Sequence, residues 1–161
     1  MSASFQIRLV NNADRPWIFE LLSERWGSSL IVSRGRVYDA ADLPGFAAFQ
    51  NDDLAGLLTF CEEDDSVEIV TLDSLLKNVG VGRGLIDALK SHALETGCRR
   101  IWLITTNDNL GAMRFYQMCG FVYVAIYPNA LVKSRELKPE IPEFGIDGIP
   151  LRDEIEMALL L

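Results

Sequence analysis

Residues 77–86 have the sequence KNVGVGRGLI and join a predicted strand, residues 66–72, to a predicted amphipathic helix, residues 83–96. The glycines in this segment permit positive φ and let a ligand approach the backbone closely. Successive N–H groups in such a turn form an anion-binding nest, and the first N–H groups of the helix have no partner within it. The helix dipole adds positive potential at the same end. The segment therefore predicts a phosphate-binding turn.

Two common phosphate-binding patterns do not fit this turn. The dinucleotide pattern G-x-G-x-x-G needs glycine at position 85, which is Leu85, and an acidic residue about 20 positions on, near Arg99 and Arg100. The phosphate-loop pattern G-x-x-x-x-G-K-[ST] is absent from the sequence. A glycine-rich loop without a ligand stays open as an alternative, because short motifs are weak signals.

Hydrophobic periodicity predicts the elements that precede the turn. A helix begins at Asn12 or Asp14 and ends at Gly27. Residues 28–44 are irregular, and we expect a short second helix or a mobile loop there. Strands are predicted at residues 5–10, 46–50, 54–62 and 66–72.

Alternation along residues 66–72 assigns the side chains to two faces of that strand. One face is predicted to carry Val67, Ile69 and Thr71, and the other Glu68, Val70 and Leu72.

The elements after the turn complete an α/β pattern. Asn109 is a good N-cap and Gly120 a good terminator for a helix at residues 109–119. Residues 127–154 form a long connection, which we expect to cover a substrate site or to mediate dimer contacts. Strands are predicted at residues 101–105, 121–126 and 155–161. Hairpins and helical crossovers both occur, so we expect one domain, residues 1–161, with a mixed, mostly antiparallel sheet of about six or seven strands flanked by helices.

Composition excludes several classes of protein. The chain has 161 residues, 49% hydrophobic composition and a net charge of −8. This charge argues against a nucleic-acid partner and suits a cationic small molecule such as an amine. No apolar run is long enough for a membrane span and the N-terminus does not resemble a signal peptide, so we expect a cytoplasmic protein without a membrane partner. Three scattered cysteines and one histidine predict neither disulfides nor a metal site.

Two sequence blocks resemble the GNAT superfamily of N-acetyltransferases. The spacing K-x-x-G-x-G from Lys77 to Gly82 is similar to the family signature [QR]-x-x-G-x-[GA], whose turn binds the pyrophosphate of coenzyme A. Lys77 keeps the charge of the usual arginine but lacks its planar fork. Residues from Asn109 to Phe121 resemble the family block N-x-x-A-x-x-F-Y-x-x-x-G-F. One helix and one strand separate the two blocks, as in the family.

The resemblance implies roles for individual residues. The backbone of Leu72 falls where the family bonds the pantetheine arm, and Ser74 is a further candidate beyond it. Tyr116 falls on the tyrosine that often serves as general acid. The other cofactor-binding residues implied are Val79, Gly80, Val81, Gly82, Arg83, Gly84 and Asn109.

Acceptor binding is implied for three further residues. Glu68 stands on an otherwise apolar strand and is the candidate base, a water relay or a cation-binding group; a solvated surface charge is the alternative. Ser33 and Arg34 lie where this family often shapes its acceptor pocket. Arg34 could bind a substrate carboxylate or remain solvated.

The resemblance as a whole implies an acetyl-CoA-dependent enzyme that moves an acetyl group to a primary amine of a small molecule or peptide by direct attack. Two other classes stay open: a non-catalytic acyl-CoA-binding sensor or partner module on the same fold, and an ordinary nucleotide-binding α/β protein. We expect a monomer or a homodimer.

Overall fold

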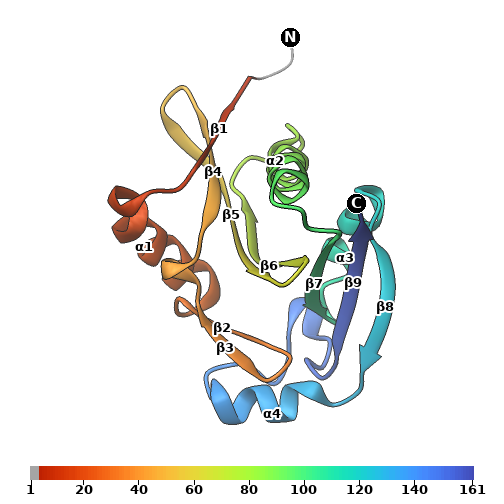
Figure 1. Ribbon diagram of the computed structural model, residues 1–161. Coiled ribbons are helices and arrows are strands. Elements are labelled where there is room, and N and C mark those ends of the chain that lie inside the picture. Colours follow the sequence, from red (N-terminus) through yellow and green to blue (C-terminus); the bar gives the residue numbers. More distant parts are fainter. Residues whose placement is uncertain (1–3) are drawn as a thin grey trace.

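The computed structural model describes residues 4–161 and is built around one large sheet (Figure 1). The strands lie in the order β1 (Gln6–Leu9), β4 (Gly45–Gln50), β5 (Asp53–Glu63), β6 (Ser66–Ser74), β7 (Arg100–Thr106), β9 (Glu154–Leu160) and β8 (Val122–Tyr127). Every neighbouring pair is antiparallel except β6 and β7, which are parallel. This confirms the predicted α/β fold with a mixed, mostly antiparallel sheet.

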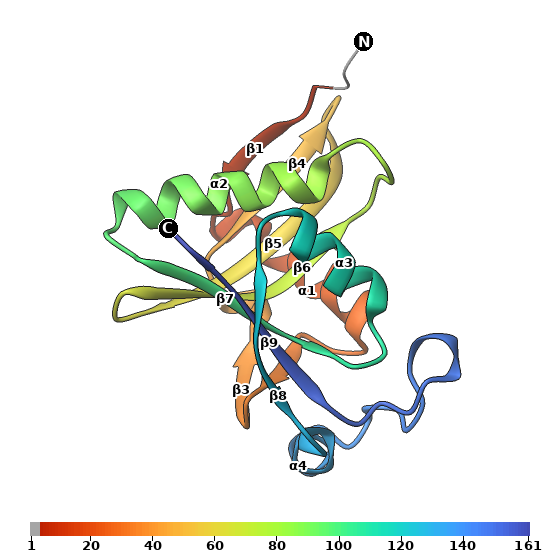
Figure 2. The ribbon, with the colours of Figure 1, turned by 90° about the vertical axis from the view of Figure 1, so that its right-hand side faces the viewer.

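Helices cover both faces of the sheet. On one face, α2 (Val81–Glu95) crosses the strands and α3 (Leu110–Met118) lies beside it (Figure 2). The predicted apolar stripe of α2 is buried in the larger core. On the other face, α1 (Arg15–Trp26) contributes Ile18 and Leu22 to a second core with Leu57 of β5. No helix within residues 4–161 combines the length and the hydropathy needed to cross a membrane.

Asp14 lies at the N-cap position of α1, one of the two positions that the sequence predicts, but its side chain makes no capping bond to the helix backbone. Its buried carboxylate accepts two hydrogen bonds from the Arg8 guanidinium at 2.7 and 2.9 Å, one from the Asn11 N–H at 2.8 Å and one from Trp17 Nε1 at 2.9 Å. The bonds from Arg8, above all, hold the pKa of Asp14 well below its usual range. The ionised carboxylate thus joins β1, the helix start and the first helical turn.

Changing Asp14 to asparagine is expected to lower the free energy of unfolding by about 2 kcal/mol at pH 7, because hydrogen bonds to a charged group are lost. The pKa is depressed in the folded state, so this stabilisation exists above the unfolded pKa of about 3.9 and disappears as the pH falls further. Urea unfolding at pH 7 and pH 3 measures the difference. Asp52→Asn, in an exposed turn, is the control. An equal Asp14→Asn loss at both pH values would contradict this account.

Residues 28–44 form a β-hairpin, so the expected short helix or mobile loop was wrong. β2 (Leu30–Ser33) pairs with β3 (Arg36–Asp39) across the turn residues Arg34 and Gly35. Both turn residues have positive φ, 50° and 74°, as a two-residue hairpin turn requires. The sequence does not reveal this turn, because its first residue is arginine, whereas asparagine, aspartate or glycine usually marks a two-residue hairpin turn.

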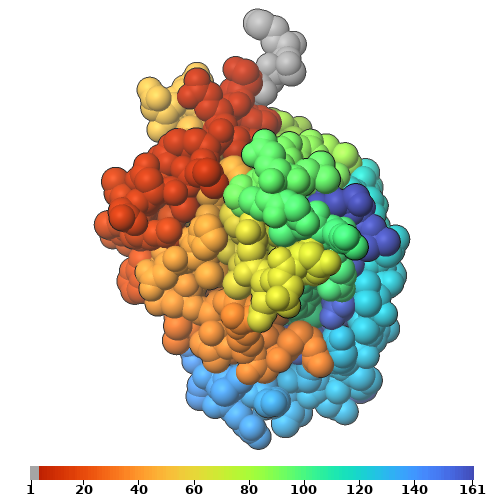
Figure 3. Space-filling view, viewed as in Figure 1, coloured from red at the N-terminus to blue at the C-terminus, as the bar shows by residue number. Residues whose placement is uncertain are grey.

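The connection 127–154 contains a helix, α4 (Ala130–Leu137), that lies against the β2–β3 hairpin. Just beyond α4, Lys138 is buried and donates to the carbonyl oxygens of Trp26 at 3.1 Å and Leu30 at 2.7 Å. Burial lowers the pKa of this ammonium group. Figure 3 shows the hairpin and α4 side by side at one end of the molecule. The hairpin and α4, which are about 100 residues apart in the chain, therefore pack together as one unit.

A β-bulge changes the faces of β6. Thr59 pairs with Thr71 and Phe60 pairs with Ile69, so Val70 is an extra residue. Beyond it the alternation is inverted: Leu72 packs toward the core under α2, whereas Thr71 bonds Thr59 on the opposite face at 2.6 Å. The predicted placement of Thr71 and Leu72 was therefore wrong, and Leu72 does not share a face with Glu68.

Candidate active site

The sheet divides into two wings between β6 and β7 (Figure 1). Their parallel pairing ends at Ile69 and Leu103. Beyond this point β6 continues to Ser74 paired with β5, whereas β7 continues paired with β9. One edge of β6 therefore has no strand partner after Ile69.

Backbone groups of Leu72 and Ser74 face this unpartnered edge. The N–H of Leu75 donates to the carbonyl oxygen of Ala55 in β5 at 2.8 Å. Because N–H and C=O groups alternate between the two edges of a strand, those of Leu72 and Ser74 face away from β5. The Ser74 hydroxyl is used locally, since it donates to the carbonyl oxygen of Leu76 at 2.8 Å. Both backbones are thus placed to bond an amide-bearing chain along β6.

The N-terminus of α2 offers free amide donors. Gly80, with a φ of 82°, is the N-cap residue, and no side chain caps the helix. The first bond of the helix runs from the Gly84 N–H to the Gly80 carbonyl oxygen at 2.9 Å. The preceding N–H groups of Val81, Gly82 and Arg83 have no partner among residues 4–161. Val79 is exposed beside them.

Two glycines of the turn also have packing roles. A Cβ at Gly82 would lie 3.0 Å from Cζ of Phe115 in α3, and one at Gly84 would lie 3.1 Å from Cδ1 of Ile7 in β1. Gly84 does not offer a free N–H, because that group bonds Gly80. A bulky residue at position 82 would therefore displace Phe115 as well as disturb the turn.

This donor set fits coenzyme A. Unpaired amides at a helix N-terminus, with the exposed Arg83, suit a pyrophosphate. The open edge of β6 suits a chain that carries amide groups, which can bond as an added strand does. Both features lie where β6 leads into α2 and therefore form one continuous site.

Tyr116 of α3 is buried and packs against Phe115 and Phe121. Its hydroxyl makes no hydrogen bond to another residue in the described part of the chain. Burial raises the pKa of this phenol, and the negative charge of Asp73 raises it further. The group therefore keeps its proton throughout the neutral range.

Asn109 and the two residues before it, Asn107 and Asp108, bond other parts of this chain. Asn109 Oδ1 accepts from the Ala112 N–H at 3.1 Å and so caps α3. Asp108 accepts from the Ile146 N–H at 2.9 Å, and Asn107 Oδ1 accepts from the N–H groups of residues 152 and 153 at 3.0 Å. This block fixes the segment before β9, in addition to any contact with a cofactor.

Glu68 is 3% exposed, which excludes a solvated surface charge. It accepts a hydrogen bond from the Ser33 hydroxyl at 2.5 Å and one from the Tyr38 hydroxyl at 2.6 Å. Burial raises the pKa of Glu68, although these two bonds oppose the shift. The structure thus brings Glu68 and Ser33 together, and both carboxylate oxygens are held by the hairpin.

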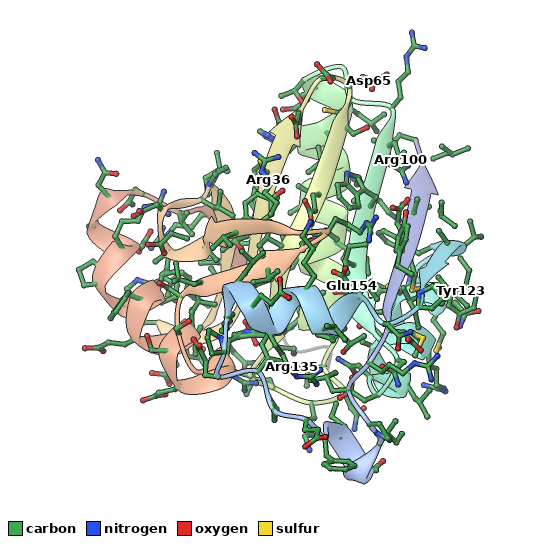
Figure 4. All side chains as sticks on the ribbon, turned by 90° about the horizontal axis from the view of Figure 1, so that it is seen from below. Arg36, Asp65, Arg100, Tyr123, Arg135 and Glu154 are labelled. Atoms are coloured by element: carbon green, nitrogen blue, oxygen red, sulfur yellow. The ribbon has the colours of Figure 1, made fainter. Side chains whose placement is uncertain are left out.

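Arg34 contacts groups of this chain. Its N–H donates to Glu154 Oε2 at 3.1 Å, and its Nη1 lies 3.6 Å from Glu154 Oε1. The guanidinium carbon lies 3.3 Å from the centre of the Tyr127 ring. Glu154 is labelled beside α4 in Figure 4. Arg34 therefore ties the hairpin tip to β8 and β9.

Changing Glu68 to glutamine is expected to flatten the pH dependence of stability. Because the folded pKa is raised, the penalty for ionising Glu68 is absent below the unfolded pKa and grows as the pH rises through the folded pKa. Relative to the wild type, the glutamine variant should gain stability between pH 4 and pH 8, measured by urea unfolding. Glu63→Gln, an exposed charge, is the control. A constant difference across this pH range would contradict the prediction.

Asp73 is a buried carboxylate that the sequence analysis missed. Trp26 Nε1 donates to its Oδ2 at 3.1 Å, and Arg25 Nη1 lies 3.9 Å from Oδ1. Burial raises its pKa. The predicted strand ended at residue 72, one residue short of it; the signal available was an acidic residue four positions before the glycine turn.

Comparison with known sequences agrees with this geometry. Residues 14–121 match the Acetyltransferase (GNAT) family, to which the chain therefore belongs. The uncharacterised protein YdhI of Bacillus subtilis is 37% identical over 146 residues, which are 90% of this chain and 91% of that protein. The spermine/spermidine N(1)-acetyltransferase of the same bacterium is 32% identical over 93 residues, 54% of this chain and 57% of that enzyme.

Solved structures show the same fold. An IAA acetyltransferase from Bacillus cereus superposes with a TM-score of 0.75 at 23% identity, covering 98% of this chain and all of that one (100%). A GNAT family acetyltransferase from Elizabethkingia anophelis with acetyl-CoA bound has a TM-score of 0.71 at 19% identity, covering 98% of each chain. Family membership confirms the predicted class: the protein is an N-acetyltransferase whose cosubstrate is acetyl-CoA.

Proposed function

We propose that this acetyltransferase acetylates a primary amine of a cationic small molecule by direct attack. The observation that carries the proposal is the unpartnered edge of β6, which leads directly into the uncapped N-terminus of α2. In this arrangement Leu72 and Ser74 bond the pantetheine arm. The pyrophosphate is bound by the turn from Val79 to Arg83, with Gly84 providing close packing and Asn109 shaping the start of α3.

The acceptor is cationic because its amine meets a buried carboxylate. We assign this role to Asp73, which lies beyond the bulge, on the unpartnered part of β6. Only Trp26 and the more distant Arg25 contact its oxygens in residues 4–161. Glu68 is less suited to bind the ammonium group, because hydroxyl groups hold both of its oxygens. The net charge of −8 favours approach of a cation, and the partial similarity to the spermine/spermidine enzyme supports a polyamine-like acceptor.

Each group has a task in this reaction. Acetyl-CoA, when bound, supplies the acetyl thioester. Asp73 orients the amine and accepts its proton, either directly or through a water molecule. The Leu72 N–H donates to the carbonyl oxygen that gains charge. Tyr116 holds a proton for the leaving sulfur, since its raised pKa exceeds the value of about 8.5 for a thiol.

Glu68 acts in this proposal as a positioning residue. With Ser33 and Arg34 it fixes the hairpin against β6 and β9, and so shapes the acceptor side. Its alternative role as the base remains part of the test below.

A panel of amines, with release of free thiol as the readout, tests the function. Diamines and polyamines should be acetylated and neutral amides should not. Asp73→Asn should raise KM for the amine at least tenfold without changing KM for acetyl-CoA, whereas Asp65→Asn, at the other end of β6, should change neither. If Glu68→Gln instead abolishes kcat and Asp73→Asn does not raise KM, the base is Glu68 and our assignment is wrong.

The same experiment separates an enzyme from a sensor. A sensor module would bind acetyl-CoA in calorimetry and release no thiol with any amine. We further propose a cytoplasmic enzyme that acts as one domain, without nucleic-acid or membrane partners.

A further inference from the structure

Strand β8 forms one edge of the sheet and is strongly apolar. Its sequence, VYVAIY, contains no charged residue. Val122, Tyr123, Val124 and Ile126 are 64%, 53%, 51% and 63% exposed. β8 is the last strand in the order of the sheet (Figure 1), and Figure 4 places Tyr123 at the outer margin of the sheet. These side chains therefore border a row of backbone groups without a strand partner.

Edge strands of soluble proteins usually carry charges, prolines or cover that prevent pairing. The opposite edge, β1, follows this rule with Gln6 and Arg8. β8 has only a bulge at Val124, where its register with β9 shifts between Tyr123 and Ala125. The two edges of the sheet thus differ, and β8 is the one open to pairing.

Exposed apolar side chains lie on both faces of this edge. Tyr123 and Ile126 stand opposite Met157 and Ile155, on the face covered by α3, whereas Val122 stands opposite Ala158 on the other face. Met118 at the end of α3 and Leu160 at the end of β9 are 59% and 80% exposed. At roughly 100 Å² for each of the six exposed side chains, the apolar surface is on the order of 600 Å², and the backbone edge of β8 adds to it. A stable interface needs about 800 Å² from each partner.

We propose that β8 pairs antiparallel with β8 of a second copy of the chain, so that the two sheets become one. An antiparallel pair of identical strands has two-fold symmetry and closes on itself, which removes both open edges. The strand offers no charge by which a charged partner could be recognised. A neutral contact also suits two copies that each carry a net charge of −8 and repel one another elsewhere.

Light scattering coupled to gel filtration tests this pairing, with 1 to 100 µM protein as an approximate range for transient and stable dimers. The wild type should have twice the 18.0 kDa mass of the chain. Ile126→Lys places a charge on the paired edge and should give the monomer mass. Leu94→Lys is the matched control, because Leu94 is 62% exposed on α2, outside the proposed interface, and this variant should remain a dimer.

Hydrogen exchange provides a second measurement on the same proteins. The amides of β8 that face away from β9 should exchange slowly in the wild type and in Leu94→Lys, and rapidly in Ile126→Lys, while α2 stays protected in all three. A monomeric wild type, a dimeric Ile126→Lys variant, or assemblies larger than two copies would each overturn the proposal.

Discussion

Changing Arg83 to glutamate is expected to weaken acetyl-CoA binding roughly 30-fold, or by about 2 kcal/mol, in calorimetric titration. Arg83 stands in the first turn of α2, whose N–H groups of Val81 and Gly82 are unpaired in the described structure. A carboxylate there would repel the pyrophosphate and cancel the positive potential of the helix end. The side chain is exposed and makes one bond, from Nη2 to the Met118 carbonyl oxygen at 2.8 Å, so the fold should tolerate the change.

The control for this prediction is Arg99→Glu. Arg99 is exposed beyond the other end of α2, about 20 Å away along a helix of this length, so it changes the net charge equally. Its affinity for acetyl-CoA should fall less than twofold. The Arg83→Glu effect should also shrink at high salt, because exposed charges are screened. Equal losses in the two variants would mean that only net charge matters, and would contradict the proposed site.

Changing Tyr116 to phenylalanine is expected to lower kcat by about 10²–10³-fold, the range typical of a lost general acid, with little change in either KM. The hydroxyl makes no hydrogen bond to another residue within residues 4–161, so its removal breaks no hydrogen bond of the fold. The free energy of unfolding should therefore stay the same or rise slightly. Loss of rate together with unchanged stability is the combined result that a purely structural tyrosine would not give.

Tyr123→Phe is the matched control, because it removes a phenol whose partner is Gln117 on the outer surface of α3. Its kcat should be that of the wild type. Initial rates at saturating acetyl-CoA and thermal unfolding provide both readouts. If Tyr116→Phe retains the full rate, another group protonates the leaving sulfur.

Elements with local signals could be predicted from the sequence, and the structure shows them. The glycine turn and the capping residue Asn109 each act within a few residues, so spacing alone locates them. The β2–β3 hairpin could not be recognised in this way, because its four-residue strands are stabilised by contacts from Ser33 and Tyr38 to Glu68 on a distant strand.

The candidate site was predictable to the same extent. Glu68 stands out as an acid in an apolar strand, whatever the fold. Asp73 does not, because its burial depends on Trp26, which is 47 residues away in the chain. The bulge at Val70 also has no local signal, since it arises from the pairing with Thr59 and Phe60. Distant contacts, rather than weak propensities, account for what the sequence leaves out.

The bulge at Val70 has a practical consequence for engineering the acceptor preference. The bulge inverts the alternation of side chains along β6. Beyond it, the odd-numbered positions face the acceptor side and the even-numbered positions face the core. A library of variants should therefore randomise Thr71 and Asp73 together and keep Leu72 apolar. Deleting Val70 would remove the extra residue and, because Thr71 would then follow Ile69 directly, should leave Thr71 and Asp73 on the acceptor side and Leu72 in the core. Homologous enzymes should be aligned through this residue before their specificities are transferred.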